Sequence, residues 1–273
     1  RDLHSYPTRR SSDLSLFFII GVLRMASAKG DRLQAFLVTG FNFLLFVYVT
    51  VLLLLRWIVS DHIPLSNGFE IMQFMAWATL LVTFVLQRHF PLLLHFSTLL
   101  AGLILLVAML GESNPQVTSL MPVLQSPLLS IHVVAVMFSY TLFAMCFFLS
   151  LTYFIIGIVK SSALSGQWTM FNGQITALSQ LLLYPAVYCL AIGIFIGAVW
   201  ANQSWGRYWG WDPKEVWALI TLFIYALPLH AGSIRWFNVP RHFNIYMLLA
   251  FLSILMTYFG VNFFLGGMHS YAG

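Results

Sequence analysis

Long apolar runs separated by short polar connections dominate the pattern of this chain. Seven such runs cover Leu33–Val59, Phe69–Leu86, Pro91–Leu110, Leu128–Val159, Ile175–Trp200, Val216–Leu229 and Phe243–Leu265. At about 1.5 Å per helical residue, most of them are long enough to cross the ~30 Å hydrocarbon core of a bilayer. The sixth run is short, but it lengthens if it starts at Asp212. The pattern therefore predicts an all-α fold, a polytopic transmembrane helix bundle with seven full spans.

The beginning of the chain differs from this pattern. Residues 1–13 are polar, and the apolar run Leu14–Leu23 that follows is about half of the length that spans a bilayer. We interpret residues 1–13 as a non-native or disordered segment that precedes a truncated N-terminal helix, and residues 14–273 as a single integral-membrane domain. A signal peptide is the alternative, but no clear cleavage site follows the run.

Basic residues fall on alternate connections between the runs, which orients the bundle. They are Arg24, Lys29, Arg32, Arg88, Lys160, Arg235 and Arg241. The positive-inside rule assigns these connections to the cytoplasm. The connections between them carry acidic residues or a balanced set of charges. The segment Trp205–Trp217 and the tail 266–273 are therefore expected on the outer face.

Composition supports a membrane protein and argues against nucleic-acid binding and against thiol chemistry by the chain itself. Hydrophobic residues make up 60% of the chain and charged residues 8%, whereas soluble domains have about 25% charged residues. The net charge of +5 comes from scattered residues and forms no basic stripe, so nucleic-acid binding is excluded. Cys146 and Cys189 stand alone inside apolar runs and are expected to be small buried hydrophobes. Any thiol chemistry would therefore belong to a partner.

A tryptophan-rich segment joins the fifth and sixth runs. Five of the nine tryptophans fall between residues 200 and 217, which concentrates a flat aromatic surface that could bind a flat ligand. The alternative is an interfacial aromatic belt, which needs no particular order of residues. Here Asp212 can be the N-cap of a helix, Pro213 fits its first position, and Glu215 can complete a capping box. The order of residues therefore favours a shaped platform that leads into a membrane helix.

Three histidines are candidate ligands because of their depth. His132 lies four residues into the fourth run and His269 follows the seventh, so both are expected at the outer level. His230 lies about 21 Å deeper than Val216 on a helical rise. Ionisable residues inside membrane helices are candidates for function, although each histidine could instead bond a neighbouring helix. Two neutral imidazoles beside an aromatic platform match the axial ligands of a six-coordinate haem.

At these residues the chain resembles the CcsA (ResC) branch of the haem-handling membrane proteins of system II cytochrome c assembly, which carry a tryptophan-rich motif. The shared signatures are Trp205-Gly-x-x-Trp-Gly-Trp-Asp-Pro-Lys-Glu-Val-Trp217, Pro64-Leu-Ser-Asn-Gly-Phe-Glu70, Ile131-His132-Val133, Leu229-His230 and Gly260-Val-Asn-Phe-x-Leu-x-Gly-Met-His269-Ser-Tyr. The resemblance spans residues 14–273 and implies that they form one haem-handling domain. The truncated first helix departs from the family pattern.

The resemblance implies the roles of the site residues. His132 and His269 would be the axial ligands of an outer haem, and His230 would belong to a second, transmembrane haem site. The second ligand of that deeper site would come from a CcsB/ResB-like membrane partner. The residues implied to bind the outer haem ring are Trp205, Trp209, Trp211, Asp212 and Trp217. Asp212 is favoured as a helix cap, with a purely charge-dependent role as the alternative.

The implied function is that of a haem b carrier and cytochrome c synthase subunit. It would present haem to the C-x-x-C-H segment of apocytochrome c on the outer face of a bacterial cytoplasmic, or plastid thylakoid, membrane. Thiol-reducing proteins are further expected partners. Arg56 and Arg207 could neutralise haem propionates, or instead pair with Asp61 or Asp212. The alternative function is a CcmC-like haem transporter or exporter that catalyses no attachment.

Overall fold

The computed structural model describes residues 32–110, 125–159, 165–261 and 265. Every regular element in these residues is a helix, which confirms the all-α prediction. The chain divides into two compact units, Arg1–Leu120 and Met121–Gly273. The first 31 residues, including the segment 1–13 and the expected truncated helix, lie outside the described part.

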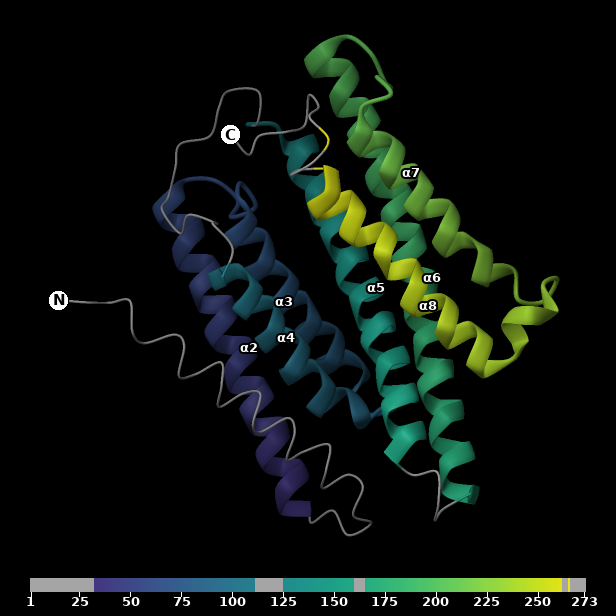
Figure 1. Ribbon diagram of the computed structural model, residues 1–273. Coiled ribbons are helices and arrows are strands. Elements are labelled where there is room, and N and C mark those ends of the chain that lie inside the picture. The colour runs from purple at the N-terminus through teal and green to yellow at the C-terminus, as the bar shows by residue number, and fades with distance from the viewer. Residues whose placement is uncertain (1–31, 111–124, 160–164, 262–264, 266–273) are drawn as a thin grey trace. The chain divides into compact units, whose positions relative to one another are not determined.

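The described part of the first unit contains three helices, α2 (Arg32–Ser60), α3 (Gly68–Leu86) and α4 (Leu92–Leu110) (Figure 1). Small polar side chains join them, as is usual for helices that meet in a membrane. Trp77 Nε1 donates to Thr50 Oγ1 at 2.9 Å between α3 and α2. Asn42 Nδ2 donates to the Leu94 carbonyl at 3.1 Å between α2 and α4. Much of α2 is nevertheless left for lipid to cover.

In its described residues, the second unit contains four α-helices, two short 3₁₀ helices and one π-helical turn. They are α5 (Pro127–Val159), α6 (Ser165–Trp205), α7 (Pro213–Ala226), η3 (Leu227–His230), η4 (Arg235–Asn238), α8 (Pro240–Leu255) and the π-helix η5 (Met256–Gly260). Asn244 of α8 is fully buried and joins two other helices. It accepts from Ser150 Oγ at 2.9 Å and donates to Thr176 Oγ1 at 3.0 Å.

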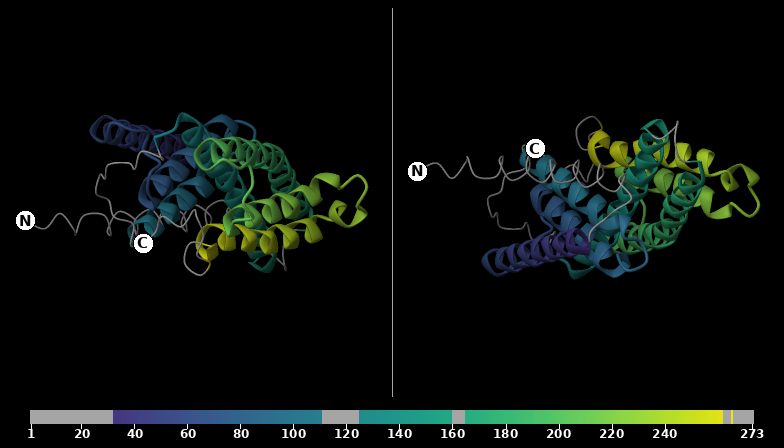
Figure 2. Two further views of the ribbon diagram at one scale, coloured as in Figure 1. Left: turned by 90° about the horizontal axis from the view of Figure 1, so that it is seen from above. Right: turned by 90° about the horizontal axis from the view of Figure 1, so that it is seen from below.

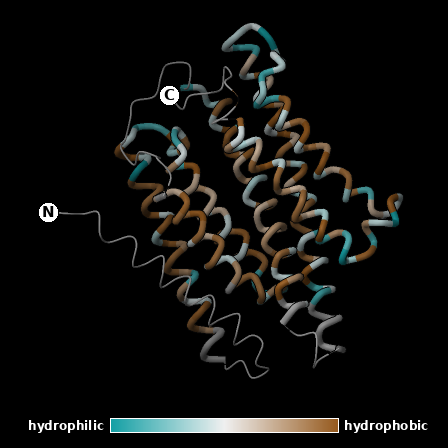
Figure 3. Tube along the Cα trace, in the orientation of Figure 1, coloured by the Kyte–Doolittle hydropathy of each residue, from teal (hydrophilic) through white to brown (hydrophobic). Residues whose placement is uncertain are grey.

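Apolar helix bodies and polar connections confirm a polytopic membrane bundle (Figure 3). Within the described residues, six helical stretches are long and apolar enough to cross a membrane: Phe36–Ser60, Gly68–Leu86, Leu92–Met109, Pro127–Ile155, Asn172–Trp205 and Pro240–Gly260. α7 is not among them, because it has only 14 residues. The sixth run is nevertheless helical from Pro213 to His230, because the 3₁₀ helix η3 follows α7 directly, so the count of seven full spans stays a prediction.

Pro228 explains why α7 stops. Proline has no N–H and so cannot close the α-helical bond to the carbonyl of Ile224, four residues earlier. That carbonyl instead accepts a hydrogen bond at 2.8 Å from the Tyr246 hydroxyl of α8. The chain tightens into the 3₁₀ helix η3, which places His230 at its end. Figure 2 shows α7 and α8 side by side from above and from below.

Candidate functional site

The tryptophan-rich segment connects α6 to α7 with a capped helix start. Asp212 is the N-cap of α7, and Pro213 occupies its first position. The Asp212 carboxylate accepts from Lys214 N at 3.1 Å, and Glu215 Oε2 accepts from Asp212 N at 3.2 Å. The predicted capping box is therefore confirmed. Asp212 is also buried, with 6% of its surface exposed, so its cap is screened from water.

Glu215 also holds the backbone before the cap. The same oxygen, Oε2, accepts from Gly210 N at 2.8 Å. The two amides that it binds belong to the residues on either side of Trp211. Trp211 has a φ of +55° and an indole that is 75% exposed. A left-handed backbone is unfavourable for a bulky residue, so the Glu215 carboxylate stabilises a conformation that turns this indole outward.

The tryptophans form edge-on pairs. Trp209 and Trp211 meet at 88° with ring centroids 6.0 Å apart, and Trp200 and Trp205 meet at 71° and 4.9 Å. Trp200 is buried at 2% exposure. The expected single flat surface is thus not what the loop forms, because its tight turn rotates successive indoles. Trp217 lies in the first turns of α7, where its carbonyl accepts from Thr257 Oγ1 at 3.3 Å.

His132 lies in the second turn of α5 and packs against α6. Its Nδ1 is 2.7 Å from the carbonyl oxygen of Gly193. A carbonyl can only accept, so Nδ1 carries the hydrogen, and in the neutral form of the ring the lone pair is then on Nε2. This tautomer is the one in which Nε2 can bind a metal. The donor chemistry of His132 therefore fits an axial haem ligand.

The first turns of α5, the α6–α7 connection and the last turns of α8 lie at the same end of the second unit (Figure 1). His132 and the tryptophan-rich segment are thus brought to one end. His269 lies outside the described residues, so its convergence with His132 stays a prediction. The π-helix η5 is the last helical element of α8 before that part of the chain. Such π-turns occur often near functional sites.

His230 lies at the other end of α7, exposed at the end of η3. An open groove of about 380 Å³ runs along the outward side of α7 and includes it. The other lining residues are apolar: Ile220, Phe223, Ile224, Ala226 and Leu227. The groove can hold an apolar ligand beside one imidazole. His230 thus lies at the opposite end of the α7–η3 helical stretch from Asp212, and its role in a separate, deeper site stays a prediction.

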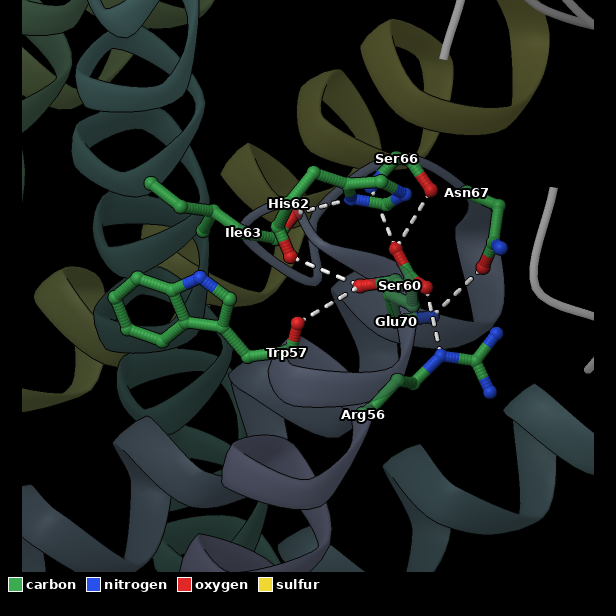
Figure 4. Close-up of polar contacts among 8 residues, drawn as sticks. All are labelled: Arg56, Trp57, Ser60, His62, Ile63, Ser66, Asn67 and Glu70. Carbon is green, nitrogen blue, oxygen red and sulfur yellow. Dashed lines mark hydrogen bonds and ion pairs between the residues drawn. The ribbon is translucent and has the colours of Figure 1, made fainter. Parts of the chain in front are cut away.

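Arg56 is paired inside the first unit. Its Nε lies 2.6 Å from Glu70 Oε1, and Glu70 is completely buried (Figure 4). The backbone N and the hydroxyl of Ser66 both donate to Glu70 Oε2 at 2.7 Å. The expected alternative partner, Asp61, is therefore replaced by Glu70. Asp61 has a left-handed φ of +56° where the chain leaves α2.

The guanidinium of Arg56 contacts the Glu70 carboxylate through its Nε. The terminal nitrogens of Arg56 point away from the carboxylate in Figure 4. The guanidinium carbon also lies 5.3 Å from the centre of the Phe69 ring, within cation–π range. The motif Pro64–Glu70 thus builds a capped turn around a buried ion pair.

Arg207 lies within the tryptophan-rich loop. A methyl group at Gly210 would come within 3.1 Å of its Nε, so the guanidinium rests directly on the glycine backbone. Lys214 is a second cation on this loop. Burial lowers the pKa of Lys214, and the neighbouring Asp212 carboxylate opposes that shift. The segment Trp205–Trp217 therefore combines the exposed indole of Trp211 with two basic side chains.

The two cysteines are free thiols. Cys146 is fully buried and donates to the Ser179 carbonyl at 3.4 Å, as expected for a small core residue. Cys189 is only half-buried.

The sequence of this chain is similar to those of known proteins. Residues 65–269 match the family model described as Cytochrome C assembly protein. The chain belongs to this family. The description of the family names cytochrome c assembly as the process in which its members act.

Several curated relatives agree with this assignment. Protein NrfI of Wolinella succinogenes is 41% identical over 85% of the chain, but the chain covers only 26% of NrfI. Cytochrome c biogenesis protein CcsA of Chlamydomonas reinhardtii is 34% identical over 82% of the chain and is covered to 65%. The CcsA protein of a Prochlorococcus marinus strain is 30% identical over 93% of the chain and is covered to 91%. The chain thus has the character of a CcsA-type protein, and spans only part of the first two relatives.

Two glycines that contact His132 were not singled out by the sequence pattern. Gly193 and Gly197 are four residues apart on α6, and His132 and Val136 are four residues apart on α5. A small-x-x-x-small spacing of this kind is typical of close helix contacts in membranes. The G-x-x-x-G spacing could have indicated the contact, but not which helix faces it.

Proposed function

We propose that this protein is a haem b carrier and a subunit of a cytochrome c synthase. Haem is its substrate, held at the tryptophan-rich end of the second unit and presented there to apocytochrome c. That end would face the periplasmic side of a bacterial cytoplasmic membrane, or the lumenal side of a thylakoid membrane. The observation that carries the proposal is the bond from His132 Nδ1 to the Gly193 carbonyl, which supports Nε2 as the nitrogen that would bind the iron.

The outer site would combine ligands from both ends of the second unit's sequence. His132 would bind the haem iron on one side and His269 on the other. The indoles of Trp205, Trp209, Trp211 and Trp217 would contact the ring, with the exposed Trp211 making the largest apolar contact. Aromatic contacts of this kind bury large surface areas at a binding site.

The charged groups near the loop suit the polar edge of the substrate. Haem carries two propionates, and Arg207 lies exposed on the Gly210 backbone where it could bind one through charge-assisted hydrogen bonds. Arg56 could bind a propionate only with its terminal nitrogens, because its Nε is committed to Glu70. Arg207 is therefore the stronger candidate of the two.

The attachment reaction needs orientation more than acid–base catalysis. Each cysteine of the C-x-x-C-H segment adds its S–H across a haem vinyl group, so that sulfur bonds to one carbon and hydrogen to the other. Atoms and electrons balance without an external oxidant or reductant, provided that thiol-reducing partners keep the cysteines reduced. The protein would contribute the positioning of the ring edge beside the thiols.

The groove at His230 supports a second, transmembrane haem site. A CcsB/ResB-like membrane protein would cover the apolar side of α7 and supply the opposing ligand. The five apolar residues of the groove would give such a site its wall, and His230 would give it one imidazole. Haem would be accepted there before it is held at the outer site.

The proposal is tested on the purified membrane complex. The visible spectrum should show low-spin haem with two nitrogen ligands, and His132→Ala or His269→Ala should lose haem or leave it five-coordinate. Both single variants should still insert in the membrane. Unchanged spectra in both would refute the outer site.

Adding reduced apocytochrome c separates synthesis from transport. The synthase function requires thioether-linked haem to form in the purified complex. If haem passes to an acceptor and no thioether forms, the protein is a CcmC-like transporter or exporter instead.

A further inference from the structure

The His132 ring occupies a notch on α6 that only glycine can form. A methyl group at residue 197 would lie 2.6 Å from both Cε1 and Nδ1 of His132 and 3.4 Å from its Cγ. These distances are far below an ordinary carbon contact. The Nδ1–Cε1 side of the imidazole thus lies against the backbone of Gly197, while its Nδ1 reaches the carbonyl of Gly193 one turn earlier.

The neighbouring contact has a different character. A methyl group at Gly193 would lie 2.6 Å from Val136 Cγ2 and 3.3 Å from the Val136 backbone nitrogen. Gly193 therefore lets α5 approach α6 closely enough for its carbonyl to accept from His132. Gly193 therefore sets the distance between the two helices, and Gly197 leaves room for the His132 ring.

We propose that Gly193 and Gly197 are positioning residues, which fix the rotation and tautomer of His132 so that Nε2 faces the haem iron. This inference rests on the proposed function. A hydrogen bond from the second nitrogen of an axial histidine orients the ring and makes it a more basic ligand. Here a backbone carbonyl supplies that bond, so side-chain substitution cannot remove the acceptor, and only the notch can be closed.

The first experiment needs no haem. The full chain, labelled with ¹⁵N-histidine, is placed in lipid nanodiscs from cells that make no haem, and His132→Gln identifies the His132 resonances. The parent should show a protonated Nδ1 and an unprotonated Nε2. Gly197→Ala should lose this pattern. Gly173→Ala is the matched control, because residue 173 lies on the same helix with nothing within 4 Å of an added methyl group.

The second experiment measures haem bound by the complex. Gly197→Ala should weaken haem binding about 10- to 100-fold, the usual effect of losing an outer partner of a metal ligand. Gly173→Ala should bind as the parent does. The double variant Gly193→Ala/Val136→Ala removes the shortest contact, which is with Val136 Cγ2, and keeps the carbonyl acceptor, so it should retain more haem than Gly193→Ala alone. Equal binding by Gly197→Ala and Gly173→Ala overturns the proposal.

A third comparison remains decisive if Gly197→Ala does not fold. His132→Ala opens the notch, and added imidazole should then restore the low-spin spectrum. In His132→Ala/Gly197→Ala the clash is gone, but the methyl group fills the place of the ring, so imidazole should restore little. Equal rescue in both variants contradicts the notch.

These outcomes distinguish a failure of the proposed outer haem site from a failure of the positioning role of the glycines. If His132→Ala retains normal haem, the proposed outer site fails, and with it the link between the glycines and haem. If His132→Ala loses haem while Gly197→Ala changes neither the ¹⁵N pattern nor haem binding, the outer site stands and the positioning role is wrong.

Discussion

Trp211 shows how one side chain can determine the shape of a binding surface. Its left-handed backbone would relax if the neighbouring amides were released, and Glu215 binds both of them with one oxygen. The capping box was predictable, because Asp-Pro-Lys-Glu is a local signal. The additional bond to Gly210 was not, because it depends on the turn that the loop makes around Trp211.

Replacing Glu215 tests this arrangement. Glu215→Ala removes the acceptor of two amides, and we expect a loss of about 1–3 kcal/mol in unfolding free energy. Glu215→Gln keeps a carbonyl oxygen and should retain most of the stability. The emission maximum of the tryptophans and thermal unfolding in detergent provide the measurements. Parental emission and stability in Glu215→Ala would show that Trp211 is held by other contacts.

Two substitutions of Asp212 distinguish a helix-capping role from a role that needs its negative charge. Asn can accept from Lys214 N as Asp does, whereas Ala cannot, so Asp212→Ala should cost about 0.5–2 kcal/mol and Asp212→Asn much less. Haem occupancy and cytochrome maturation should follow the same order. An equal, severe loss in both variants at normal protein levels would instead indicate a role for the negative charge.

The Arg56–Glu70 pair gives a prediction for the first unit. Arg56→Leu leaves a fully buried carboxylate without its cation, and we expect a loss of about 3–5 kcal/mol. Arg56→Leu/Glu70→Leu removes both charges and should recover much of it. Thermal unfolding of the two variants decides this. If Arg56→Leu is stable but loses haem, Arg56 acts on a propionate and its pairing is secondary.

At the scale of the element, α7 shows where sequence prediction succeeds and fails. Its start follows from consecutive residues, Asp212 to Glu215. Its end depends on Pro228 and on Tyr246, which lies 22 residues from the carbonyl that it binds. The pairing of Arg56 follows the same rule: Asp61 is nearer in sequence, but Glu70 is brought close by the next helix. Tertiary partners of this kind leave no local pattern.

A double-mutant cycle tests the end of α7. Tyr246→Phe removes the hydroxyl donor to the Ile224 carbonyl and should cost about 1–3 kcal/mol. Pro228→Ala supplies an N–H to the same carbonyl and allows the α-helix to continue. The loss from Tyr246→Phe should therefore be smaller in the Pro228→Ala background. Equal losses in both backgrounds would mean that the two groups do not share this acceptor.

At the scale of the whole molecule, hydropathy and charge were sufficient to predict a polytopic helical membrane protein. The seven-span count rested on run length alone and stays a prediction; run length did not reveal that Pro228 changes the end of the sixth run from α-helix to 3₁₀ helix. The candidate site was predictable at His132 because a polar residue in an apolar run is conspicuous. The two glycines beneath it were not, since glycine is common in membrane helices and only the packing of α5 distinguishes these two.

We expect substitution of His230 to affect haem delivery and not haem binding at the proposed outer site of His132. His230→Ala should reduce delivery of haem to the outer site in cells, while haem added to the purified protein should still bind there. The physical reason is that one iron cannot be ligated by groups about 20 Å apart along a helix axis. Spectra of the cell-purified and reconstituted variants provide the comparison. Normal haem content and cytochrome maturation in His230→Ala would exclude a role in transit.

The seating of His132 on α6 also bears on the order of events during synthesis. α5 and α6 are consecutive in the chain, so the ring and its glycine notch can meet as soon as this helical hairpin has entered the membrane. His269 emerges from the ribosome only after α7 and α8. A nascent chain would therefore complete the His132 half of the proposed iron site early, before His269 and the substrate are present.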